Sequence, residues 1–150
     1  MRLWHVKLLP YLPDRQLKGQ LREVIAIMHN WKLHDDPKSL IVNLVKDYPK
    51  EQLTEYFLIY CHAYYVRFGK KVRDSYINEF IEFSDYDNNK GATIKDGIFK
   101  NWHDIGYLKV CMTNLFEKYI YAKGKTKLTD FEWERLLSGY KNITGEEFSI

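Results

Sequence analysis

The chain has 150 residues, of which 45% are hydrophobic, 16% aromatic and 29% charged, with a net charge of +3. This length suits one domain that buries roughly two-thirds of its unfolded surface, and the composition excludes a disordered chain. No apolar run reaches the ~18 residues that span a bilayer, and residues 1–15 lack the apolar stretch of a signal peptide. We therefore expect a cytoplasmic protein without a membrane partner, whose mild charge does not by itself indicate nucleic-acid binding.

The first predicted element is an irregular segment over residues 1–13, because Pro10 and Pro13 disfavour a regular helix. A helix is expected from about Asp14, since its apolar residues keep the spacing i, i+4, i+7, i+8, i+11 that buries one face. These residues are Leu17, Leu21, Val24, Ile25 and Met28. A second face carries Arg15, Gly19, Arg22, Ala26 and, beside them, Glu23, which predicts a shallow strip bordered by charge.

Three more helices are predicted in the middle of the chain. Asp36 and Pro37 fit an N-cap and first helical position, and Pro49 stops that helix after Tyr48. Residues 51–68 follow as the central helix, with Gly69 as its stop, and residues 74–83 form the next.

The polar segment 85–91 is predicted to be a turn. It weakly resembles a calcium loop, but the glycine comes one place late and position twelve is Asp96 instead of glutamate, so we expect no calcium there. A helix over 105–121 follows, and Thr129 with Glu132 forms a capping box for a last helix that Gly139 should close. The pattern predicts an all-α fold, with residues 1–150 as a single compact multi-helix domain.

No metal or organic cofactor is expected. The five histidines (His5, His29, His34, His62 and His103) include no i, i+4 pair, and phosphate-loop, hydrolase and dinucleotide motifs are absent. Cys61 and Cys111 both fall on apolar helical stripes, so we interpret them as buried reduced thiols.

Positive charge gathers at the N-terminal end. Five basic residues precede Glu23, against the single acidic Asp14. Two further clusters lie near helix ends, where cations also simply favour the helix dipole. They comprise Arg67, Lys70, Lys71 and Arg73, and then Lys118, Lys123, Lys125 and Lys127. The N-terminal excess is the better candidate for a surface that meets phosphate.

The opening residues, MRLWHVKLLPYLPDRQLKGQLREVIAIMHNW, are similar to the start of the pyrimidine-dimer DNA glycosylases, also called the endonuclease V family. The matching elements are Met1 to His5, Leu12-Pro13, Gln16-Leu17, Gly19-Gln20 and Arg22-Glu23, in one ungapped stretch. The resemblance covers residues 1–83 and leaves the helical part 84–150 unmatched. It implies a DNA repair glycosylase with abasic-site lyase activity that acts on double-stranded DNA.

The resemblance also implies a site. The chain's own α-amine, at Met1, would be the nucleophile that forms a Schiff base at the sugar C1′, and Glu23 the catalytic carboxylate. An α-amine has an unperturbed pKa of about 7.7–8.0, so part of it is uncharged at cellular pH. Residues expected to line the DNA surface are Arg2, Arg15, Gln16, Gln20 and Arg22.

Alternatives stay open at several of these residues. In the phage members of this family a small residue follows the initiating methionine, and removal of that methionine exposes the amine of the small residue. Here residue 2 is arginine, whose bulk normally prevents such removal, so the free amine would belong to Met1, one residue further out. Trp4 fits a core anchor better than a base-stacking wedge. His5 fits either a group that orients Glu23 or a structural imidazole. The competing function is a non-catalytic helical module that binds nucleic acid or protein; the oligomeric state is not indicated.

Overall fold

The computed structural model describes residues 2–34, 39–87 and 97–150, and every regular element in these ranges is helical. This confirms the all-α prediction. The elements are the 3-10 helix η1 (Val6–Tyr11), α1 (Asp14–Leu33), α2 (Leu40–Val45), α3 (Lys50–Phe68), α4 (Asp74–Ser84), α6 (Ile105–Ile120), the 3-10 helix η2 (Gly124–Thr126) and α7 (Asp130–Thr144).

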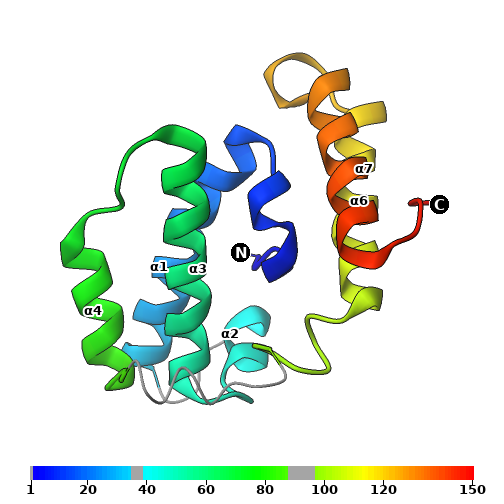
Figure 1. Ribbon diagram of the computed structural model, residues 1–150. Coiled ribbons are helices and arrows are strands. Elements are labelled where there is room, and N and C mark those ends of the chain that lie inside the picture. The colour runs from blue at the N-terminus through cyan, green and yellow to red at the C-terminus, as the bar shows by residue number, and fades with distance from the viewer. Residues whose placement is uncertain (1, 35–38, 88–96) are drawn as a thin grey trace.

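The N-terminal segment lies between two groups of helices. Helices α1, α3 and α4 pack on one side of it, and α6 with α7 forms an antiparallel hairpin on the other (Figure 1). η1 contacts both α3 and α7. Leu3, Leu8, Leu9 and Leu12 are fully buried there. Residues 2–12 therefore hold the two groups of helices together through a shared core.

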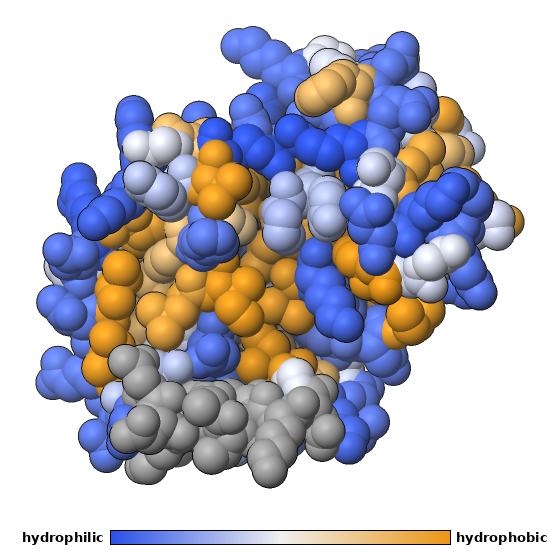
Figure 2. All heavy atoms as spheres, viewed as in Figure 1, coloured by the Kyte–Doolittle hydropathy of each residue, from blue (hydrophilic) through white to orange (hydrophobic). Residues whose placement is uncertain are grey.

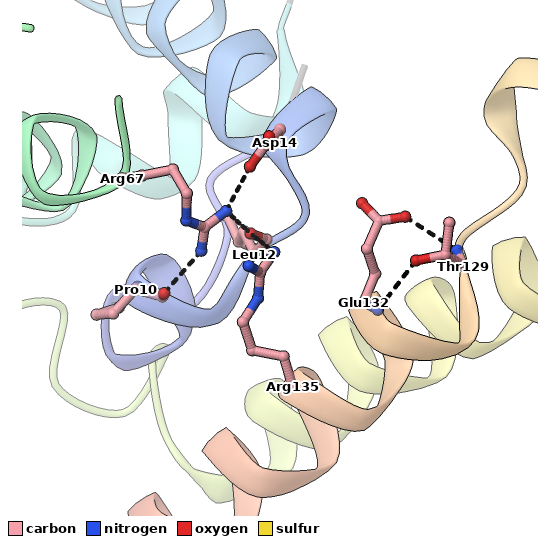
Figure 3. A network of polar contacts seen from close by, with 7 residues as sticks. All are labelled: Pro10, Leu12, Asp14, Arg67, Thr129, Glu132 and Arg135. Carbon is pink, nitrogen blue, oxygen red and sulfur yellow. Dashed lines mark hydrogen bonds and ion pairs between the residues drawn. The ribbon is translucent and has the colours of Figure 1, made fainter. Parts of the chain in front are cut away.

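Two arginines fix the end of η1 from opposite sides (Figure 3). From α3, Arg67 donates to the Leu12 carbonyl at 2.6 Å, to the Pro10 carbonyl at 2.9 Å and to Asp14 at 2.8 Å. From α7, Arg135 donates to the same Leu12 carbonyl at 3.0 Å. Burial and the neighbouring Arg67 lower the pKa of Arg135. The shared carbonyl ties α3 and α7 to one point of the N-terminal segment.

Most helix ends follow the local chemistry of the sequence. α1 begins at Asp14, directly after Pro13, and α3 ends at Gly69, whose φ of 67° is left-handed and costs glycine little. The capping box is confirmed, because Glu132 N–H donates to the Thr129 hydroxyl at 3.1 Å and Thr129 N–H donates to the Glu132 carboxylate at 2.9 Å (Figure 3).

The prediction that Gly139 closes the last helix is wrong. α7 continues to Thr144 and ends at Gly145, which has a φ of 78°. Gly139 lies inside the helix, and the ring of Tyr11 packs directly on it: an added Cβ would lie 2.3 Å from the Tyr11 Cγ. A glycine inside a helix can thus serve close packing instead of a stop.

This close approach predicts opposite effects for two helix-interior glycines. Gly139→Ala should lower the free energy of unfolding by about 1–3 kcal/mol, because the methyl group overpacks the contact between α7 and Tyr11. Gly19→Ala is the control. An added Cβ there meets nothing within 4 Å, so better helix propensity should stabilise by about 0.5–1 kcal/mol. Urea unfolding checks both; destabilisation of equal size would contradict the packing argument.

The α2 region differs from its prediction. Its proposed N-cap at Asp36 and Pro37 lies outside the described residues, as do positions 88–91 and Asp96 of the calcium-loop comparison. α2 itself ends at Val45, and residues 46–48 continue as turns. Pro49 disfavours helical backbone only at Tyr48, directly before it, so it does not explain why α2 ends already at Val45.

Hydrophobic side chains gather in the middle of the face shown in Figure 2, where α3 and the N-terminal segment lie, and hydrophilic residues surround them. Among the described residues, no helix is both long and apolar enough to cross a membrane. Cys111 is buried and Cys61 half-buried, and both are free thiols, as predicted. Burial raises the pKa of Cys61 to about 12, which keeps it protonated.

Candidate functional site

A buried glutamine positions the start of the chain against α1. The side chain of Gln20 is fully buried and accepts a hydrogen bond from Trp4 N–H at 2.8 Å. Its amide nitrogen donates to the Arg2 carbonyl at 2.7 Å. The hydroxyl of Tyr56, from α3, donates to the Trp4 carbonyl at 2.7 Å and lies 3.2 Å from the Gln20 oxygen. Backbone groups of residues 2–4 are thereby hydrogen-bonded to the side chains of Gln20 and Tyr56, an arrangement called here the Gln20 bracket.

Next to the Gln20 bracket lies an open pocket of about 330 Å³, called here the Glu23 pocket. Four of its residues come from α1, two from the N-terminal segment and one from α6. They are Arg15, Gln16, Gly19 and Glu23, then Arg2 and Trp4, then Lys118. The Arg2 guanidinium lies 4.7 Å from the centre of the Trp4 ring, a cation–π distance that holds this cation at the pocket wall.

The Glu23 carboxylate is half-buried among cations. Burial raises its pKa, while the positive charges of Arg2 and Arg22 and a hydrogen bond from the Arg2 main chain act in the opposite direction. The carboxylate is therefore held beside the second residue of the chain, where burial and the neighbouring cations act on its pKa in opposite directions. A group placed in this way can stabilise a developing positive charge or accept a proton.

Two shallow hollows adjoin the pocket. The α1 hollow, of about 480 Å³, is lined by Asp14, Arg15, Lys18, Gly19 and Arg22. The α6 hollow, of about 220 Å³, is lined by Arg2, Asn114, Glu117, Lys118 and Ala122. Each hollow shares two residues with the Glu23 pocket, so the three form one continuous depression with an excess of basic side chains.

The predicted site residues fall into two groups. Arg2, Arg15, Gln16, Arg22 and Glu23 all line this depression. Gln20 does not, because its side chain is inside the protein, where it anchors the main chain of the N-terminal segment. Met1 lies outside the described residues.

His5 is a structural imidazole in this arrangement. It is buried, and its Nδ1 accepts the Lys7 N–H at 3.1 Å, which places the ring proton on Nε2. Nε2 then donates to the His103 carbonyl at 2.9 Å, so both ring nitrogens are engaged away from Glu23. His103 stacks on this ring with 5.2 Å between ring centres and accepts the Val6 N–H on its own Nδ1. The histidine pair therefore joins the N-terminal segment to the start of α6.

The pair predicts a loss of stability in acid. Burial, and then the nearby His5, lower the pKa of His103 from 6.5 to about 3, and its Nε2 has no hydrogen-bond partner among the described residues. Between these two values the unfolded chain binds a proton that the folded chain does not. The free energy of unfolding should therefore fall as pH drops from 6.5 toward 3, by up to about 1.4 kcal/mol per pH unit.

Urea unfolding between pH 7 and pH 4 measures this slope. His103→Gln, which keeps an acceptor for the Val6 N–H but does not titrate, should flatten it. The exposed His62 gives the control, because His62→Gln should leave the slope unchanged. Equal slopes for all three proteins would contradict the assignment.

Sequence reasoning missed the contribution of α6. Lys118 was assigned with the helix-end cations, yet it lines both the Glu23 pocket and the α6 hollow. Tyr107 also reaches the site from α6, since its hydroxyl donates to the Leu3 carbonyl. The i, i+4 spacing of Asn114 and Lys118 does indicate that they share one face of the helix. The sequence does not indicate that this face lies beside Arg2, because the fold brings the two together. No group of residues in the described parts forms a metal site.

The molecule is thus an all-α protein with an open basic pocket built around a half-buried carboxylate and the first residues of the chain. The family model of pyrimidine dimer DNA glycosylase matches residues 1–75, half of the chain. The chain belongs to this family, and DNA is its substrate class. No curated protein and no solved structure matches it.

Proposed function

We propose that the protein is a glycosylase for pyrimidine-dimer-type lesions in double-stranded DNA that also cleaves abasic sites through its terminal amine. The observation that carries the proposal is the half-buried Glu23 carboxylate, which accepts a hydrogen bond from the Arg2 main chain at the wall of a basic pocket. The sequence bonds Met1 directly to Arg2, which is why the proposal assigns the reacting amine to this pocket.

The proposed chemistry needs one amine and one carboxylate. The neutral amine of Met1 attacks the sugar C1′, the glycosidic bond breaks, and the base leaves with the bonding electrons. The bond between C1′ and the ring oxygen O4′ then breaks, O4′ takes a proton from the attached amine, and a Schiff base remains at C1′. Glu23 stabilises the cationic sugar, and it assists removal of a C2′ proton as the 3′ carbon–oxygen bond breaks and phosphate leaves.

The proposed DNA contacts divide into cations and a positioning group. Arg2, Arg15, Arg22 and Lys118 hold phosphates around the pocket, and Gln16 offers an amide to the same surface. Gln20 acts indirectly by keeping the Arg2 main chain in place. An open pocket with cationic walls suits a nucleotide that has left the base stack.

The test is borohydride trapping on a duplex with one abasic site. A covalent protein–DNA adduct is expected for the wild-type chain, and a chain extended by residues before Met1 should lose it. Intact mass spectrometry of the N-terminus identifies the residue that carries the free amine. Wild-type protein that binds the duplex without forming an adduct overturns the lyase proposal and supports a non-catalytic DNA-binding module.

A further inference from the structure

One face of α6 continues past the hollow that it lines. Asn114, Glu117 and Lys118 line the α6 hollow with Arg2. Tyr121 comes seven residues after Asn114, four after Glu117 and three after Lys118. This spacing places it on the same face of the helix, one turn further along. Its backbone is still in the right-handed helical region and its N–H donates to the Glu117 carbonyl at 2.8 Å, so the helical register holds to this residue.

The Tyr121 side chain points away from the protein core. Its neighbour Tyr119 faces α7, where its ring stacks on Trp133 with a 12° angle between planes and its hydroxyl donates to Asp130. Two residues on, roughly 200° around the helix axis, Tyr121 is directed away from α7. It is 75% exposed, unlike Tyr56, Tyr60 and Tyr140, which are buried.

Basic residues outnumber acidic ones near this exposed ring, where Glu117 is the acidic residue one turn before it. Lys118 lies one turn before it, Arg2 stands across the hollow, and the exposed Lys123 and Lys125 follow it in the chain. Aromatic rings among cations suit nucleic acid, because the cations bind phosphates while a base stacks on the ring. A protein partner would be expected to cover further apolar residues, but the hollow beside the ring is lined mainly by polar side chains.

We infer that Tyr121 is a stacking residue for a nucleobase next to the lesion, which makes it a specificity-determining contact outside the family-matched residues. This rests on the proposed function, since the base belongs to DNA bound at the Glu23 pocket. In intact duplex every base already has two stacked neighbours. At a damaged or abasic position one neighbour is displaced, and the Tyr121 ring takes its place. The contact therefore favours damaged over intact duplex.

The experiment measures binding without chemistry. The probe is a duplex that contains a tetrahydrofuran abasic analogue, which cannot form a Schiff base, with 2-aminopurine as the neighbouring base. Wild-type protein should quench the 2-aminopurine fluorescence through stacking. Tyr121→Ala should remove the quenching and weaken binding about 5- to 100-fold, the range expected from loss of one stacked base. Tyr121→Phe, which keeps the ring, should retain both.

Phe131 provides the matched control. It is 72% exposed, lies on α7 and is not among the residues that line the pocket or its two hollows. Phe131→Ala should leave binding and quenching unchanged. Wild-type affinity and quenching in Tyr121→Ala would overturn the stacking inference, while the borohydride adduct would still support the proposed function. If the wild-type protein formed no borohydride adduct but still quenched the 2-aminopurine, that result would count against the proposed lyase activity alone. The fluorescence measurement involves no covalent step.

Discussion

Glu23→Gln should reduce strand cleavage at an abasic site by about 10²- to 10⁴-fold, the range that a positioned acid–base group contributes. The substitution keeps the size of the side chain and its ability to accept from the Arg2 main chain. It removes the negative charge that, in the proposed mechanism, stabilises the cationic sugar. Affinity for the tetrahydrofuran duplex should be retained or rise, because a negative charge leaves a basic pocket. Single-turnover cleavage assays and binding titrations measure the two effects separately.

Glu117→Gln is the matched control for this substitution. Glu117 is an exposed carboxylate that lines the α6 hollow, and its replacement should change cleavage only a few-fold. The pH profile adds a second check. The need for a neutral amine makes the rate of both proteins fall as pH drops through the amine pKa. Because burial raises the pKa of Glu23, the wild-type rate should fall more steeply at pH values above the ordinary glutamate range, and Glu23→Gln should lack this second decline. Equal cleavage by both variants would remove Glu23 from the mechanism.

Gln20→Met should lower the free energy of unfolding by about 2–4 kcal/mol, because two backbone polar groups lose their partner at once. These are the Trp4 N–H and the Arg2 carbonyl, while the Tyr56 hydroxyl loses one contact and keeps the Trp4 carbonyl. Methionine has nearly the same volume, so no cavity contributes to the loss. Cleavage should fall as well, because the main chain that faces Glu23 is no longer held in place.

The control lies one turn earlier on the same helix. Gln16 lines the pocket, and its side-chain oxygen is buried without a hydrogen-bond partner in the described part of the chain. Gln16→Met should therefore be neutral or slightly stabilising in urea unfolding. If both glutamine variants unfolded at the same urea concentration as the wild type, the Gln20 bracket would contribute nothing to the free energy of unfolding.

Local signals predicted most of the fold. The starts of α1 and α7 followed from Pro13 and the Thr129 capping box, and the end of α3 from Gly69. The prediction that Gly139 ends the last helix was wrong because this glycine makes room for Tyr11, a residue that is distant in the chain. Local patterns cannot report such a contact, so the length of α7 was underestimated.

The site was predictable only where it follows helix periodicity. The strip with Arg15, Gly19 and Glu23 was read directly from the spacing of α1. The burial of Gln20 was not, because a glutamine on a helix gives no sign that it pairs with the main chain of another segment. Lys118 joined the site through tertiary packing alone.

The two arginines that meet at the Leu12 carbonyl set the minimal size of a working protein. A fragment that stops at residue 75 would retain the whole stretch shared with the family and Arg67, but neither Arg135 nor the α7 surface that covers Tyr11. The N-terminal segment would then be held by Arg67 of α3 but not by α7. Deletion of α7 should therefore loosen the main chain beside Glu23 even though the whole family-matched stretch remains.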